Sequence, residues 1–289
     1  MTIALFGATG KVGQLVAREL LERGETVHAC VRNSDKARKG LGTTGALTIS
    51  EMPLDDLGAV STAVRGASTI FISMGSIGVE GNIQRTVLEA ARRSTALRQL
   101  VRLSVLNAST SSLGINQRAH QTLDFAATLA DIPYTTIQPA IFSASLLAAA
   151  EEVCAHDTWT GLADIGKVAL IDHRDVANVA VHILANSNSW GAHYQLTGPS
   201  LMDWPQAMAL LSAELKRTIR FLTVPDRELL TRMLGAGVPP GFAELLITRE
   251  WAIEAGENER VTNTVTDLTG QIPRTVEAFL HANRSAFLT

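Results

Sequence analysis

The feature that most constrains this chain is a glycine turn set between a short apolar strand and an amphipathic helix. The apolar run Thr2–Phe6 leads into the turn, and apolar residues at helical spacing follow it to Arg23. A strand, a glycine turn and a helix in this order predict a cradle for the phosphates of a dinucleotide, because the free N–H groups and the positive end of the helix dipole face the turn. The residues expected to bind the phosphates are Gly7, Thr9, Gly10, Lys11, Val12 and Gly13.

The three glycines of this turn have different expected roles. Their spacing is GxxGxxG rather than GxGxxG. We expect Gly7 to permit the tight turn and Gly10 to permit the close approach of a pyrophosphate. Gly13 is expected to let the helix pack closely on the strand.

Strands and helices are predicted to alternate through the first half of the chain. This rhythm is typical of an α/β, Rossmann-type fold with a doubly wound parallel sheet. The predicted strands are Thr2–Phe6, Thr26–Val31, Leu47–Ile49, Ser68–Ser73, Leu100–Ser104 and Tyr134–Gln138, and the predicted helices are Lys11–Arg23, Asp56–Arg65, Asn82–Arg93 and Gln117–Leu129.

The second half has a less regular pattern, with short strands predicted at Val168–Ile171, His193–Leu196 and Arg220–Val224. We expect residues 1–153 to form the dinucleotide-binding domain, completed by about residues 167–199. Residues 200–289 together with 154–166 are expected to form a smaller, mostly helical substrate lobe. Ligands of open α/β sheets bind at the carboxyl ends of the strands, so the lobe is expected over that edge.

Composition excludes several classes of function. The net charge of −3 gives no basic footprint for nucleic acid. No apolar run reaches the length of a membrane span, and we expect no leader before the first strand. Cys30 and Cys154 are the only cysteines, which argues against a disulfide framework. No cluster has metal-ligand spacing. We expect a cytoplasmic protein with a small-molecule substrate, as a monomer or homodimer.

The residue after the second predicted strand indicates which dinucleotide binds. NAD-specific folds place an acidic side chain there to hold the ribose diol. This chain has Arg32, whose planar guanidinium suits a 2′-phosphate, with Asn33 and Lys36 close by. NADP, as NADPH, is therefore favoured over NAD. No side chain is assigned to the adenine.

Several segments resemble the NmrA-like branch of the atypical short-chain dehydrogenase/reductases, which includes quinone-reductase-like NAD(P)-binding proteins. The resemblance spans nearly the whole chain and is specific for fold and cofactor class. It rests on Gly7–Gly13, Val31-Arg32-Asn33, Leu103-Ser104, Ile132–Pro139, Ile171–Ala177, Tyr194–Pro199 and Val265–Phe279.

The usual proton donor of the wider superfamily, Tyr-x-x-x-Lys, is missing. The chain has two tyrosines, and residues 138 and 198, four positions on, are Gln and Gly. The resemblance places His120 where related reductases carry a catalytic lysine, Asn116 at the tyrosine position, and Ser104 where a substrate-binding serine often lies. His120 then either donates a proton, hydrogen-bonds a carbonyl, or holds the nicotinamide ribose.

Further contacts are expected at other strand ends. Met74 follows the fourth strand, and Pro139 and Ala140 follow the sixth; these three are expected to contact the cofactor. Ile141 and Phe142 are expected to contact the substrate. Asp175 is interpreted as a helix cap or dipole partner, whereas the roles of His173 and Arg174 stay open.

Two classes of function fit these observations. The first is an NADPH-dependent oxidoreductase that transfers hydride to a small electrophilic carbonyl compound: a quinone, an enone or, less well, a ketone. The missing tyrosine favours acceptors whose reduced anion is delocalised. The second class, also implied by the resemblance, is a non-catalytic NAD(P) sensor. A non-redox isomerase or cyclase is a third possibility, because a fold does not fix a function.

Overall fold

The computed structural model describes residues 1–129 and 133–288. The chain divides into two compact units. The first comprises Met1–Ser104, Ala119–Gln138 and His173–Tyr194, and the second comprises Val105–Arg118, Pro139–Asp172 and Gln195–Thr289.

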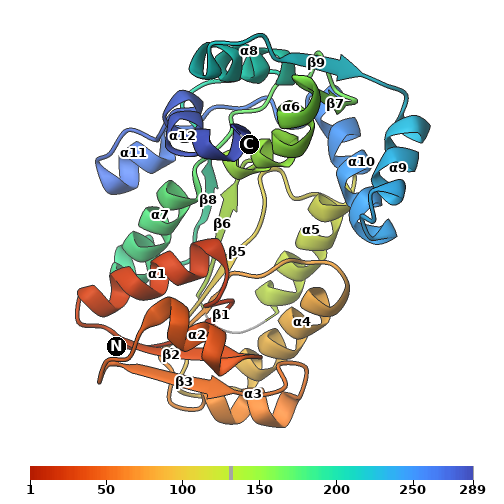
Figure 1. Cartoon of the computed structure of the whole chain (residues 1–289). Helices are drawn as coiled ribbons and strands as arrows, with labels where there is room; N and C mark the ends of the chain where they lie inside the picture. Colours follow the sequence, from red (N-terminus) through yellow and green to blue (C-terminus); the bar gives the residue numbers. More distant parts are fainter. Residues whose placement is uncertain (130–132, 289) are drawn as a thin grey trace. The chain divides into compact units, whose positions relative to one another are not determined.

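A seven-stranded sheet forms the centre of the fold, in the order β3-β2-β1-β4-β5-β6-β8 (Figure 1). The pairs from β3 through β6 are parallel. The direction of winding reverses between β1 and β4, which is the switch point where doubly wound sheets bind ligands. The strands are β1 Thr2–Phe6, β2 Thr26–Val31, β3 Leu47–Glu51, β4 Thr69–Ile72, β5 Gln99–Leu103, β6 Tyr134–Pro139 and β8 His193–Leu196.

Helices cover both faces of this sheet, so the predicted doubly wound Rossmann-type fold is confirmed. Helix α1 contacts α7, and α3 contacts α4 (Figure 1). Ala4 and Phe6 of β1 lie in one buried cluster with Val60 of α3 and Ile83 of α4. The helices are α1 Lys11–Glu22, α2 Ser34–Leu41, α3 Leu57–Val64, α4 Gly78–Arg93, α5 Ile115–Thr128 and α7 His173–Ala185.

The second unit contains mostly helices. Its strands β7 and β9 form a two-stranded parallel sheet. Trp159 packs edge-on against Trp204 and Phe221, with ring centroids 5.2 and 5.5 Å away, and this contact belongs to a buried apolar cluster. The elements are η1 Ser143–Ala149, α6 Ala150–His156, β7 Thr158–Gly161, α8 Trp204–Leu215, β9 Arg220–Thr223, α9 Asp226–Gly235, α10 Pro240–Glu254, α11 Thr264–Thr269 and α12 Val276–Ala282.

One predicted strand, Val168–Ile171, is wrong. Val168 makes an isolated bridge to Met202, and Ile171 makes another to Phe142. The four residues are buried, which explains the apolar run, but the two ends pair with different segments and no ladder forms. Among the described residues, no helix is long and apolar enough to cross a membrane.

Candidate cofactor and catalytic site

The turn between β1 and α1 gives two of its glycines a structural role. Gly7 has a φ of +90°, and a Cβ there would lie 2.0 Å from the carbonyl oxygen of Ser73. A Cβ on Gly13 would lie 2.2 Å from the carbonyl oxygen of Gly7. Both glycines therefore allow backbone segments to approach each other, as the sequence predicts.

Gly10 is different, because the nearest atom to an added Cβ is the Gly7 oxygen at 3.3 Å. It is exposed and occupies the N-cap of α1. No side chain caps this helix, and its first turn has no acidic residue. The N–H groups of the first turn, which includes Lys11 and Val12, are thus free to bind an anion. The turn fits the pyrophosphate of a dinucleotide beside the β1/β4 switch point; Thr9 lies half-buried in it.

Arg32 follows β2 as an exposed side chain, and its guanidinium makes no hydrogen bond or ion pair with any residue the structure describes. Asn33 has a structural role, since its side chain accepts the Lys36 N–H at 2.7 Å and caps α2. Glu51, at the end of β3, accepts the Ser34 N–H at 2.9 Å, and hydrogen bonding with the Ser34 side chain, and then with its N–H, lowers the pKa of the Glu51 carboxyl group. Sequence reasoning did not identify Glu51 as a partner of Ser34, the first residue of α2.

Met74 follows β4, and its side chain lies next to Gly7: a Cβ on Gly7 would be 3.2 Å from the Met74 Cγ. The loop there is held by Gln84 of α4, whose side-chain nitrogen donates to the carbonyl oxygens of Met74 (3.2 Å) and Gly75 (2.6 Å). The other predicted contacts lie in the second unit. There Ala140 is buried and Ile141 is half-buried.

Phe142 and Pro139 also belong to the second unit. Phe142 is half-buried; it pairs with Ile171 and accepts the Ser145 hydroxyl hydrogen at 2.5 Å. Pro139 ends β6, and its carbonyl oxygen accepts the Leu106 N–H at 2.8 Å.

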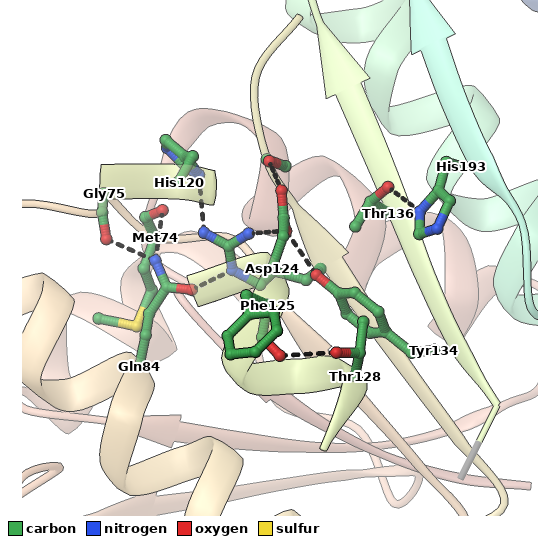
Figure 2. Close-up of polar contacts among 12 residues, drawn as sticks. Met74, Gly75, Gln84, His120, Asp124, Phe125, Thr128, Tyr134, Thr136 and His193 are labelled. Carbon is green, nitrogen blue, oxygen red and sulfur yellow. Dashed lines mark hydrogen bonds and ion pairs between the residues drawn. The ribbon is translucent and has the colours of Figure 1, made fainter. Parts of the chain in front are cut away.

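A buried polar cluster lies at the end of β5 (Figure 2). Its centre is Arg102, which is 0% exposed. The guanidinium donates from Nε to the Gln84 side-chain oxygen at 2.7 Å, forms an ion pair with Asp124, and bonds His120 Nδ1 at 2.7 Å. Two of these partners come from α5 and one from α4. The arrangement satisfies the buried charge on three sides, as an interior charge requires.

The contact with Arg102 fixes the state of His120. A guanidinium has no acceptor, so the His120 Nδ1 must accept the bond, and the ring is neutral with its proton on Nε2. Burial, and then the charge of Arg102, hold the pKa of His120 well below its ordinary value. Nε2 makes no hydrogen bond with any residue that the structure describes. His120, which is 4% exposed, therefore presents one free N–H donor and is a poor source of protons at neutral pH.

The cluster also contains two hydroxyl groups, and both donate hydrogen bonds to Asp124. Ser104 Oγ donates to Asp124 Oδ2 at 2.6 Å, and the Tyr134 hydroxyl donates to Oδ1 at 2.5 Å (Figure 2). Burial raises the pKa of Tyr134 above its ordinary value. Neither hydroxyl is thus an available acid.

The structure brings His120 and Ser104 into one cluster through Arg102 and Asp124. Asn116 lies in the first turn of α5 and belongs to the second unit, where it has a polar partner. Sequence reasoning missed Arg102 and Asp124. The available signal was a single arginine within the apolar strand Leu100–Leu103.

The opening of α7 contains His173, Arg174 and Asp175, and each of them has a polar partner. Asp175 is buried in the first turn, where a carboxylate interacts favourably with the helix dipole. Among the residues that the structure describes, no group of histidine, cysteine, aspartate and glutamate side chains has the arrangement of a metal site.

Comparisons with known proteins also indicate an NAD(P)H-binding protein. Residues 7–187 match the NAD(P)H-binding family. The chain is 27% identical to quinone oxidoreductase 2 of Escherichia coli, with 93% of each chain covered. It is 27% identical to the NAD(P)H azoreductase of Xenophilus azovorans, with 99% of each covered.

One solved structure shows the likeness of fold. It is an NADPH-dependent quinone oxidoreductase of Escherichia coli in complex with NADPH, with a TM-score of 0.90, 23% identity, and coverage of 98% of this chain and 99% of that one. With the family match and the relatives, it confirms the predicted resemblance. The chain belongs to the NAD(P)H-binding family and, with its quinone-reductase-like relatives, is an NAD(P)H-dependent oxidoreductase.

Proposed function

We propose that this protein uses NADPH to reduce conjugated electrophiles, quinones first and enones next, in preference to plain ketones. One observation carries the proposal: the polar cluster around Arg102 contains hydrogen-bond donors but no available acid. His120 is held neutral by Arg102, and the Ser104 and Tyr134 hydroxyls both bond to Asp124.

Hydride transfer creates different anions from a quinone and from a plain ketone. A quinone becomes a phenolate-like anion whose conjugate acid has a pKa of about 10, as in tyrosine. A plain ketone becomes an alkoxide, whose conjugate acid is near water at about 16. The difference of about 6 pKa units corresponds to about 8 kcal/mol. One well-placed hydrogen-bond donor contributes about 3–4 kcal/mol, so the His120 N–H cannot close that gap alone.

Each residue then has a definite task. Gly10 and the first-turn N–H groups of α1 hold the pyrophosphate, and Arg32 holds the 2′-phosphate. When bound, NADPH supplies a hydride from the C4 atom of its nicotinamide. The His120 Nε2–H donates a hydrogen bond to the acceptor oxygen, and the anion that forms takes its proton from water. We further propose that the cofactor is contacted by Met74, Pro139 and Ala140, and the substrate by Ile141 and Phe142.

The names of the relatives support the same class of acceptor. One is a quinone oxidoreductase and another an azoreductase; quinones and azo compounds both delocalise the charge that hydride adds. Cys30 and Cys154 are free thiols, which suits the reducing cytoplasm that we propose as the location.

The experiment that tests the function measures NADPH oxidation by the purified protein with a quinone, an enone and a saturated ketone of similar size. We expect kcat/KM to fall in that order, with the ketone at least about 100-fold below the quinone, because the protein lacks a general acid and such an acid contributes about 10²–10⁴-fold. Equal rates with the quinone and the ketone would disprove the proposed mechanism.

The preference for NADPH has its own test. We expect NADPH to bind at least about tenfold more tightly than NADH, or about 1.4 kcal/mol, because the free Arg32 guanidinium pairs with the 2′-phosphate. Arg32→Ala should remove this difference while leaving NADH binding nearly unchanged. Titration of both cofactors measures it. Arg65→Ala, another exposed arginine at the C-cap of α3, is the matched control, and equal affinities in the unmodified protein would remove Arg32 from the site.

A further inference from the structure

Arg102 is a charged side chain in a place where charge is costly. It is fully buried in β5 between apolar neighbours. Replacing a buried ion pair with apolar residues of similar volume is often neutral or stabilising. Its ion pair with Asp124 therefore does not by itself account for an arginine at this position, and its other two contacts need a reason.

Those two contacts connect Arg102 with His120 and, through Gln84, with the loop that follows β4. The Arg102 Nη2 bonds the His120 ring at Nδ1, 2.7 Å away. The Arg102 Nε bonds the Gln84 side-chain oxygen, and the Gln84 nitrogen donates to the carbonyl oxygens of Met74 and Gly75. A single guanidinium thus connects α5 with the loop that follows β4 (Figure 2).

We propose that Arg102 is the positioning residue of this site: it holds His120 as a neutral ring with the proton on Nε2, and it holds the Met74–Gly75 backbone through Gln84. The first effect turns His120 into a hydrogen-bond donor for an acceptor oxygen. The second fixes the loop beside the phosphate-binding turn. The inference rests on the proposed function for its purpose, but its structural claim is independent of any substrate.

The geometry explains why this residue is arginine. A guanidinium presents donors in a fixed planar fork, so one group serves Gln84, Asp124 and His120 together. A lysine ammonium is a compact point charge on a flexible stem and lacks that planar fork. It would keep the ion pair with Asp124 but leave the orientation of the ring and the loop less fixed.

Asp124 completes the arrangement from the other side. Its two oxygens accept from Arg102, Tyr134 and Ser104, so the carboxylate is satisfied in its charged form. The guanidinium is thereby held in place and its charge is balanced. The ring of His120 then faces a cation at Nδ1, which disfavours a second positive charge on the ring.

The test uses nitrogen NMR of protein labelled with ¹⁵N-histidine, which reports which ring nitrogen carries the proton. The chain has seven histidines, and His120→Gln assigns the signal by its loss. We expect His120 to remain neutral and protonated on Nε2 between about pH 5.5 and pH 8, the range in which an ordinary histidine titrates. A His120 signal that is protonated on Nδ1, or charged near pH 6.5, would overturn the proposal, and this measurement needs no variant at Arg102.

Variants then separate the role of Arg102 from simple stabilisation. In Arg102→Lys we expect a mixture of His120 tautomers and a fall in kcat for the enone of about 100-fold, the cost of a small misplacement at a reacting centre, with little change in the KM for the enone. Arg102→Met combined with Asp124→Asn removes both charges and avoids a buried unpaired carboxylate; it should behave in the same way. Arg92→Met, on the exposed face of α4, is the control.

The role of Arg102 in holding the Met74–Gly75 backbone is tested by Gln84→Met. This variant should leave the His120 tautomer unchanged, because the Nη2 contact remains, but weaken NADPH binding about tenfold, because the loop loses both hydrogen bonds from the Gln84 amide. Unchanged NADPH affinity would overturn the proposed role of Arg102 in holding this loop. An Arg102→Lys variant with the original His120 tautomer and kcat would overturn the proposed role of Arg102 in holding His120. If His120 has the expected tautomer but no acceptor is reduced, the proposed function fails and the positioning role stands.

Discussion

Replacement of His120 by alanine is expected to lower kcat for a conjugated enone by about 10²–10³-fold, the cost of removing one donor to a developing oxyanion. The physical reason is the loss of the His120 Nε2–H, a hydrogen-bond donor on a ring that Arg102 holds neutral. The loss should be smaller with a quinone, whose anion needs less stabilisation. The affinity for NADPH, measured by titration, should change little.

The control for this variant is His156→Ala, which removes an exposed histidine at the end of α6. It should have the activity of the unmodified protein. If His120→Ala reduces the enone at the normal rate, His120 is a structural member of the cluster and makes no contact with the acceptor. A rate that falls as pH rises through the ordinary histidine range would instead indicate that His120 acts as an acid.

Gly10→Val is expected to raise the Kd for NADPH by about 100-fold, or about 2.7 kcal/mol, while the fold survives. A side chain at this N-cap would project into the open face of the turn, where the pyrophosphate needs the backbone N–H groups. The Cβ atom at this position would meet only the Gly7 oxygen, at 3.3 Å. Titration with NADPH and a thermal melt give the two readouts.

Two other glycines make this prediction specific. Gly45→Val, at a position with no atom within 4 Å of an added Cβ, should change neither the Kd nor the melting temperature. Gly13→Ala should lower the melting temperature, because its Cβ would meet the Gly7 backbone at 2.2 Å. Normal NADPH affinity in folded Gly10→Val would mean that the phosphates bind elsewhere.

The fold was largely predictable from sequence because most of its elements bury one regular face. The strand Thr2–Phe6 and the helix behind it have clear apolar periodicity. Helix α2 was missed because its eight residues, Ser34–Leu41, bury only Ala37 and Leu41. The predicted strand Val168–Ile171 failed for the opposite reason: its residues are buried and apolar, but an apolar run does not say whether a neighbouring strand is in register.

The candidate site also has one part that could be predicted from sequence and one part that could not. The glycine turn between β1 and α1 was predictable, since its geometry is local and lies within seven consecutive residues. The cluster around Arg102 was not, because its partners lie 18 and 22 residues away and meet only in the folded protein. The state of His120 depends on that contact. Sequence reasoning therefore singled out the histidine as a candidate, but the structure was needed to distinguish a hydrogen-bond donor from a proton donor.

The central claim is that hydride reaches the acceptor without a proton from the protein. The most direct measurement is the single-turnover rate of NADPH oxidation by a quinone, in H₂O and in D₂O, across the pH range in which histidine titrates. We expect a rate that does not depend on pH and a solvent isotope effect of about 1, because no side chain transfers a proton in the transition state. A clear solvent isotope effect, together with a rate that falls as pH rises through about 6.5, would contradict it.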